Sequence, residues 1–261
     1  MSRLGPLFRS TRDAGRAAFI PYLTVGFPSL EATGELLDGL AGAGADVIEL
    51  GIPFSDPMAD GPTIQWTSQV ALEQGTRTDD VFRVLQDFRG RHQVPVVLFT
   101  YLNAPWARGV ERFLAEARAA GADGLLLTDL PLGSDPALEA VLESSSVDLV
   151  RLVAPTTPPG RAREIAARSQ GFVYYVSRTG VTGAAAALPP SLVDEIEGLK
   201  AAAPVPVAVG FGVSTPDQAR VLGAVADGVV VGSALMDQLR QGGVDGAVSL
   251  ARDLAGALAE R

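Results

Sequence analysis

The sequence contains no cysteine, a single histidine and a single lysine. The absence of cysteine excludes disulfides, zinc ribbons and thiol nucleophiles, and it is consistent with a reducing cytoplasm. His92 lies in a polar segment ahead of an expected strand, where we expect a surface residue, so we predict no histidine-ligated metal. Lys200 falls within a segment of helical composition, away from any expected strand end, and this placement argues against a Schiff-base aldolase.

Long hydrophobic runs and an excess of positive charge are also missing. The apolar runs have the length of strands, well short of the roughly 20 residues that cross a bilayer. The N-terminal stretch carries several arginines but no apolar core or cleavage site, so we expect a short amphipathic helix there rather than a secretory signal. The formal net charge of -9 repels nucleic acids and anionic membranes. We therefore expect a soluble, cytoplasmic protein that holds any anionic ligand by local dipoles.

What the sequence does contain is a regular alternation of short β-branched runs and longer segments rich in Ala, Leu, Glu and Arg. The expected strands cover residues 19–24, 46–50, 94–100, 124–128, 148–153, 172–177, 205–210 and 228–232. The expected helices cover residues 30–43, 79–89, 110–120, 135–145, 161–169, 192–202 and 216–225, and another helix is expected to begin near residue 62.

Eight such units in 261 residues are what a (β/α)8 barrel requires. Three expected strands are preceded by the same pattern of small residues followed by an aspartate, at Asp46, Asp123 and Asp227. With no linker dividing the chain, we predict an α/β fold in which residues 1–261 form a single TIM barrel domain with an extra N-terminal helix and extra short helices. An open, doubly wound sheet is the alternative.

Two carboxylates bracket a Pro- and Gly-rich loop after the second expected strand, in the run Glu49-Leu-Gly-Ile-Pro-Phe-Ser-Asp-Pro-Met-Ala-Asp60. Apolar residues flank Glu49, and burial of an unpartnered carboxylate raises its pKa toward the range useful for general acid–base catalysis. Asp60 precedes an expected helix, where an aspartate also serves as an ordinary turn or cap residue. Because TIM barrels place their active sites at the carboxyl ends of the strands, we take both acids as candidate catalytic residues.

The seventh and eighth expected strands lead into turns built from small residues, Gly210-Phe211-Gly212 and Gly232-Ser233. In many barrels these two loops, together with the N-terminus of a short extra helix, bind phosphate through backbone N–H groups. Neither segment contains Lys or Arg, so we predict an uncharged phosphate site, the alternative being that the glycines only permit tight turns. For the Gly-, Thr- and Ala-rich residues 177–190 we predict a mobile lid, the alternative being an ordinary connection.

These segments together resemble the tryptophan synthase alpha subunit family, and the resemblance runs nearly end to end. It rests on Phe-Ile-Pro-Tyr-Leu-Thr at 19–24, the block from Glu49 to Asp60 with the following Gly-Pro-Thr-Ile-Gln, Tyr-Val-Ser-Arg-Thr-Gly-Val-Thr-Gly at 175–183, and Gly-Phe-Gly-Val-Ser at 210–214. The resemblance implies a carbon–carbon lyase of tryptophan biosynthesis. Its reaction is retro-aldol cleavage of indole-3-glycerol phosphate to indole and glyceraldehyde 3-phosphate.

The resemblance also implies roles for individual residues. Asp60 stays ionised and accepts a hydrogen bond from the indole N–H, while Glu49 shuttles protons between the indole carbon and the glycerol hydroxyl. Tyr174 and Thr182 play supporting roles, Thr182 by contacting the catalytic aspartate when the lid closes. The implied substrate-binding residues are Tyr22, Gly183, Phe211, Gly212, Gly232 and Ser233.

A partner is implied as well. The residues that resemble the surface for the beta subunit are Pro53, Asp56, Asn103, Asp129 and Pro131. Indole passes directly to that subunit, in an α2β2 assembly whose pyridoxal phosphate belongs to beta, so we expect no cofactor in this chain.

Two aromatic residues depart from the family's pattern. Phe27 stands where many members have aspartate, and Trp66 stands where a polar or small residue is common, a change that helix packing alone would explain. Two alternatives to the lyase remain open at this point: another phosphosugar-binding barrel enzyme of amino-acid biosynthesis, and a mainly regulatory subunit.

Overall fold

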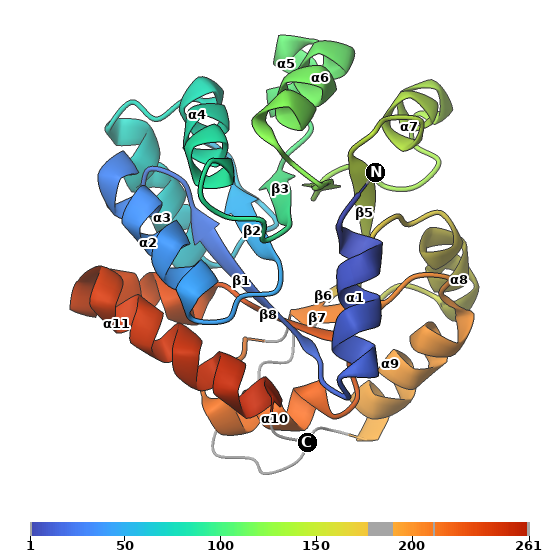
Figure 1. Cartoon of the computed structure of the whole chain (residues 1–261). Helices are drawn as coiled ribbons and strands as arrows, with labels where there is room; N and C mark the ends of the chain where they lie inside the picture. The colour runs from blue at the N-terminus through green and yellow to red at the C-terminus, as the bar shows by residue number, and fades with distance from the viewer. Residues whose placement is uncertain (1, 177–189, 211, 260–261) are drawn as a thin grey trace.

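The computed structural model describes residues 2–176, 190–210 and 212–259. Its strands form a closed parallel barrel in chain order, so the predicted (β/α)8 TIM barrel is confirmed (Figure 1). The strands are β1 (Ala18–Thr24), β2 (Ile48–Gly51), β3 (Val96–Thr100), β4 (Gly124–Leu127), β5 (Asp148–Val153), β6 (Val173–Val176), β7 (Val207–Gly210) and β8 (Gly228–Val231).

Helices surround the barrel. They are α1 (Leu4–Asp13), α2 (Leu30–Gly42), α3 (Pro62–Glu73), α4 (Thr78–Arg89), α5 (Asn103–Arg108), α6 (Val110–Ala120), α7 (Pro136–Glu143), α8 (Pro159–Ala167), α9 (Pro190–Ala202), α10 (Pro216–Gly223) and α11 (Ser233–Ala259). The extra elements are α1 at the N-terminus, α3 and α5 after their strands, and the first part of α11, whose backbone kinks at Gly243. Within the described residues, no helix is both long enough and apolar enough to cross a membrane.

The barrel interior is filled by side chains from the strands and from α1. Leu4 and Phe8 of α1 are buried against interior residues such as Ile20, Val97 and Val150. In Figure 1, α1 lies inside the ring of outer helices, against the strands. This helix therefore closes the amino-terminal end of the barrel and leaves the carboxyl end available for a site.

The repeated aspartates serve as braces between strands. Asp46 donates its N–H to the carbonyl of Phe19 in the preceding strand and accepts the N–H of Phe19 on its carboxylate, each at 2.9 Å. Asp123 makes the same reciprocal pair with Val96, and Asp227 makes it with Val207. Each carboxylate is also paired with a cation, as in the Arg16–Asp46 ion pair at 2.6 Å. β2, β3 and β7 each begin two residues later than expected, at Ile48, Val96 and Val207.

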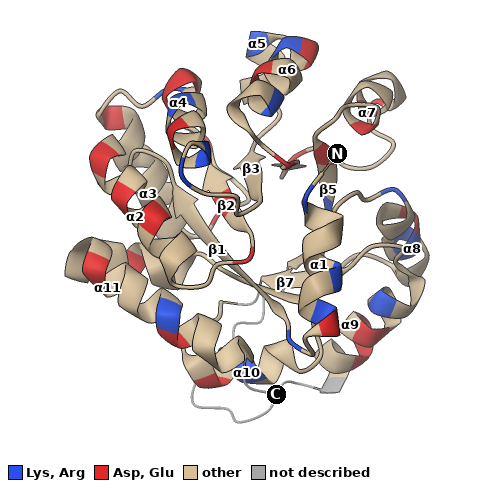
Figure 2. Cartoon of the chain, viewed as in Figure 1, with Lys and Arg blue, Asp and Glu red and all other residues tan. Residues whose placement is uncertain are grey.

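Charged residues of both signs are spread over the outer helices, whereas the strands carry few (Figure 2). A buried exception lies between β5 and α7, where Arg151 pairs with Glu139 at 3.0 Å. Glu139 is fully buried, and its carboxylate also accepts the N–H of Gly133. A fully partnered carboxylate of this kind is structural.

Candidate active site

Glu49 points into the barrel from β2, next to Tyr22 of β1 in the strand register. Its side chain is fully buried, and neither carboxylate oxygen has a hydrogen-bond partner among the described residues. Burial away from water disfavours the charged form and raises the pKa of Glu49 to about 8. At neutral pH this residue is therefore a protonated acid, which can donate a proton to a bound molecule.

Asp60 lies in the loop between β2 and α3, immediately before the first turn of α3. The hydroxyl of Tyr101 donates a hydrogen bond to its Oδ2 at 3.0 Å, and the same hydroxyl accepts the N–H of Ala59 at 3.0 Å. Burial raises the pKa of Asp60 to about 6, and the Tyr101 hydrogen bond opposes that rise. Asp60 is consequently ionised at neutral pH while Glu49 is not, so the two acids are prepared for different tasks.

Tyr101 was not among the predicted site residues. It follows β3 directly, so its only sequence signal was a place at the carboxyl end of a barrel strand. Its ring stacks on Phe54, with centroids 4.9 Å apart, in the loop that follows β2. Tyr101 therefore connects Asp60 to Phe54, a partly exposed residue of that loop.

Aromatic rings form the wall of the site. Phe99 contacts Tyr22 edge-to-face at 5.3 Å and Tyr174 at 6.5 Å. Each tyrosine occupies space that a glycine on the neighbouring strand leaves free: a Cβ at Gly51 would lie 2.1 Å from the hydroxyl of Tyr22, and a Cβ at Gly210 would lie 2.3 Å from that of Tyr174. The resulting surface suits a flat aromatic ligand.

One cavity of about 430 Å³ joins these groups at the carboxyl end of the barrel. The predicted site residues that line it together are Tyr22, Glu49, Asp60, Tyr174, Gly212, Gly232 and Ser233. The two acids thus face one cavity, whose other end is formed by the turns after β7 and β8. Asp237 of α11 also lines this cavity and was not predicted. Thr182, Gly183 and Phe211, like the predicted lid, lie outside the described residues.

The residues predicted to face a partner lie apart from the cavity lining. Asp56, Asn103, Asp129 and Pro131 are exposed, whereas Pro53 is buried and offers little surface of its own. Two large apolar side chains beside them were missed: Met58, which is 91% exposed, and Trp106 of α5, which is 61% exposed. Exposed apolar groups of this size are typical of protein–protein contacts.

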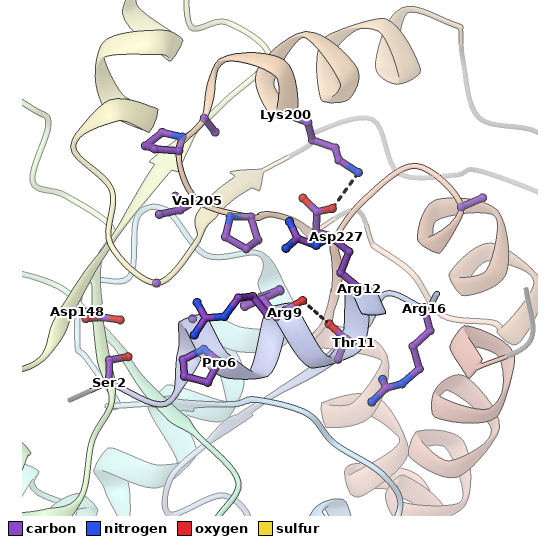
Figure 3. A pocket seen from close by; sticks show the side chains of 17 residues that line it. Ser2, Pro6, Arg9, Thr11, Arg12, Arg16, Asp148, Lys200, Val205 and Asp227 are labelled. Carbon is purple, nitrogen blue, oxygen red and sulfur yellow. Dashed lines mark hydrogen bonds and ion pairs between the residues drawn. The ribbon is translucent and has the colours of Figure 1, made fainter. Parts of the chain in front are cut away.

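A second cavity, of about 720 Å³, lies at the opposite end of the barrel (Figure 3). Arginines of α1, including Arg9 and Arg12, line it together with Lys200 and Asp227, which pair at 2.9 Å. The lysine is thus held in a structural ion pair far from the acids. His92 also lies away from the site, partly exposed, with its Nε2 2.9 Å from Asp38. The described residues contain no group of three or more side chains arranged to hold a metal.

The family model, the related sequences and the solved structures that match this chain all point to one family. The family model described as Tryptophan synthase alpha chain matches residues 8–257. The tryptophan synthase alpha chain of Geobacter sulfurreducens is 47% identical over 236 residues, 90% of this chain and 89% of that protein. That of Novosphingobium aromaticivorans is 46% identical over 260 residues, 99% of this chain and 96% of that protein. Among solved structures, ligand-free tryptophan synthase from M. tuberculosis matches with a TM-score of 0.90 at 35% identity, covering 99% of this chain and 100% of that chain.

Proposed function

This chain belongs to the tryptophan synthase alpha chain family, and from that premise we propose how its own side chains perform the family's reaction. The reaction cleaves indole-3-glycerol phosphate to indole and glyceraldehyde 3-phosphate. The observation that carries the assignment of residues is that Glu49 and Asp60 line the same cavity with pKa values of about 8 and about 6. One acid is therefore protonated at neutral pH and the other is ionised.

Asp60 acts as the fixed negative charge. Its carboxylate accepts a hydrogen bond from the N–H of the indole ring and stabilises the positive charge that develops there when the ring is protonated on carbon. The Tyr101 hydrogen bond holds one oxygen in place and leaves the other free for the substrate. The aromatic wall of Tyr22, Phe99 and Tyr174 orients the ring over the two acids.

Glu49 moves the protons. It first donates its proton to the indole carbon that bears the glycerol chain. The bond between that carbon and the chain then breaks, and its electron pair returns to the ring and releases indole. In the same step the Glu49 carboxylate removes the proton from the adjacent glycerol hydroxyl, whose oxygen becomes the aldehyde of glyceraldehyde 3-phosphate. Glu49 ends protonated, as it began, so the cycle is balanced.

The phosphate group binds at the other end of the cavity. Gly212, Gly232 and Ser233 line that end, and α11 begins at Ser233, so its free N–H groups and helix dipole favour an anion there. Within the family's pattern Gly183 and Phe211 complete this phosphate site, and Thr182 contacts Asp60 from the lid.

Members of this family work with a beta subunit. We place that subunit against the face formed by Asp56, Asn103, Asp129 and Pro131, with Pro53 buried beneath it, in a cytoplasmic α2β2 assembly. The pyridoxal phosphate of the second reaction belongs to beta, and this chain needs no cofactor of its own for a reaction that its two acids and the indole ring can complete.

Two isosteric variants test the assignment of roles. Glu49→Gln removes the proton shuttle and Asp60→Asn removes the charge on the indole nitrogen, so each is expected to lower kcat for indole release by about 10²- to 10⁴-fold. Circular dichroism should show an unchanged fold in both. Wild-type turnover in either variant would refute the role given to that residue, whereas absence of indole release from the wild-type chain and its beta complex would refute the function itself.

A further inference from the structure

The phosphate end of the cavity contains an acid that the reaction does not need. Asp237 lines the cavity and lies in the second turn of α11, the helix whose N-terminus faces the phosphate site. Among the described lining residues the ionisable groups other than tyrosine are Glu49, Asp60 and Asp237, and none is a cation. A phosphate dianion must therefore bind close to a carboxylate that repels it and competes for the same helix dipole.

Arg240 is the cation that compensates for this acid. Its guanidinium lies 3.5 Å from the Asp237 carboxylate, one helical turn further along α11. Thr63 of α3 also contacts this carboxylate, donating from Oγ1 at 3.4 Å. Asp237 is thus held on both sides, by a hydroxyl from α3 and by a charge from its own helix.

Arg240 is in turn held by the two aromatic residues that depart from the family's pattern. Its guanidinium lies over the ring of Trp66, 5.3 Å from the centroid. Trp66 packs edge-to-face on Phe27 at 5.2 Å, and Phe27 is buried. The two departures therefore contact each other and form a platform under Arg240, which restricts an otherwise half-exposed arginine to the side of Asp237.

We propose that Arg240, held on the Trp66–Phe27 platform, is a positioning residue for the substrate phosphate, acting by neutralising Asp237 at the phosphate end of the cavity. The inference rests on the proposed function for the identity of the substrate. Arg240 does not line the cavity itself but contacts Asp237, which does. It would thus supply a positive charge behind a phosphate site whose described lining residues include no cation.

The effect should be specific to phosphate and modest in size. Both partners are partly exposed, with 50% of the Arg240 side chain and 38% of the Asp237 side chain accessible, so water screens the interaction. Arg240→Gln is expected to raise KM for indole-3-glycerol phosphate and the dissociation constant of inorganic phosphate by about two- to fivefold, with kcat unchanged. Binding of indole, which carries no phosphate, should not change.

The variants of the platform and of the acid separate this role from a structural one. Trp66→Leu should weaken phosphate binding less than Arg240→Gln, and Arg240→Lys should restore part of the loss because it keeps the charge. Asp237→Asn should bind phosphate more tightly than the wild type. In the Asp237→Asn background, Arg240→Gln should have little further effect, because the charge it neutralises is gone.

Arg252→Gln is the matched control, since Arg252 is an exposed arginine on the same helix that does not line the cavity, and its loss changes the net charge equally. The proposal is overturned if Arg240→Gln binds inorganic phosphate as the wild type does, if it weakens phosphate and indole alike, or if Arg252→Gln gives the same loss. Phosphate binding is measured by calorimetry without turnover, so a wild-type chain that binds phosphate but releases no indole would refute the proposed function and leave this test intact.

Discussion

Two buried glutamates in this molecule have opposite surroundings. Glu139 is partnered by Arg151 and by the N–H of Gly133, whereas neither oxygen of Glu49 has a partner among the described residues. A buried carboxyl group without a partner destabilises the fold whenever it is ionised. Ionised Glu49 therefore lowers the free energy of unfolding, whereas its raised pKa keeps a proton available for transfer near neutral pH.

This contrast predicts the pH dependence of stability. Because the folded-state pKa of Glu49 is raised from 4.5 to about 8, its protonated form contributes stability below pH 4.5 that is lost as the pH rises to 8. Glu49→Gln should therefore be more stable than the wild type at pH 8, by on the order of 3 kcal/mol, with a smaller difference at pH 5. Denaturant titrations at both pH values measure this difference.

Glu139→Gln is the matched comparison, because the same substitution there removes the charge from a buried ion pair. We expect it to destabilise the fold, by about 2 kcal/mol or more, at both pH values. Equal effects of the two substitutions would contradict the assignment of Glu49 as the unpartnered acid.

In the proposed mechanism the pKa of Asp60 sets the lower limit of the active pH range, and the hydrogen bond from Tyr101 shifts that limit. Cleavage requires ionised Asp60 and protonated Glu49, so kcat/KM should be bell-shaped, with limbs near pH 6 and pH 8. Tyr101→Phe removes the hydrogen bond that favours ionised Asp60, and the acidic limb should move up by about 0.5–1 pH unit. The other ionisable groups that line this cavity among the described residues, Tyr22, Tyr174, Glu49 and Asp237, are unchanged in the variant.

Tyr175→Phe serves as the control for this substitution. It removes a hydroxyl that donates to Glu195 of α9, so it makes the same chemical change away from the cavity. Its acidic limb should coincide with that of the wild type. If Tyr101→Phe also keeps the wild-type limb, the hydrogen bond does not govern Asp60.

Among the elements, β6 and β7 depend on each other for the shape of the site. Tyr174 pairs with Ala208 in the register, and its hydroxyl occupies the space beside Gly210 at the end of β7. Gly210→Ala should displace the phenol from its place in the cavity wall, lowering kcat/KM by about tenfold or more and stability by about 1–3 kcal/mol. Steady-state kinetics and thermal melting measure the two effects.

Gly198→Ala provides the comparison in α9. A Cβ there meets nothing within 4 Å, so the substitution should leave turnover intact and stabilise the helix by about 0.5–1 kcal/mol. A Gly210→Ala variant that behaved like Gly198→Ala would mean that Tyr174 moves aside without cost and is not required where it lies.

At the scale of the whole molecule, the barrel separates its two ends. α1 closes the amino end, while the carboxyl end holds the cavity and, beside it, the exposed side chains of Met58 and Trp106. The loop that contains Phe54 belongs to both regions, since its ring stacks on Tyr101 next to Asp60. In the proposed docking arrangement, the partner can therefore shift the position of Asp60 through the contact between Phe54 and Tyr101.

The beta subunit should accelerate indole release markedly over the rate of the isolated chain. Trp106→Ala should weaken association with beta by about tenfold or more, because a large exposed aromatic ring is a common anchor of protein interfaces. Turnover of the isolated chain should be the same as in the wild type, since Trp106 does not line the cavity. Titration of beta into each variant measures the affinity, and Arg12→Ala at the opposite end is the control. Wild-type affinity in Trp106→Ala would place the interface elsewhere.

The sequence by itself determined the class of fold, and it singled out Glu49 and Asp60, which the structure places in one cavity. Each β/α unit can be predicted from its own stretch of sequence, because β-branched runs alternate with helical segments along the chain. A closed parallel barrel is the arrangement that buries eight such units. Glu49 was recognisable because its neighbours in the chain are apolar, so its burial followed from the strand alone.

Only the tertiary structure decided which groups shift the pKa values of those acids and what surrounds the proposed phosphate site. Tyr101 meets Asp60 across 41 residues of sequence, and Thr63 meets Asp237 across 174. Phe27, Trp66 and Arg240 come from the loop after β1, from α3 and from α11, and nothing in their local patterns predicts that they contact one another. Contacts of this kind arise from closure of the barrel, which brings the ends of distant strands and helices together, whereas hydrophobic periodicity records only which face of each element is buried.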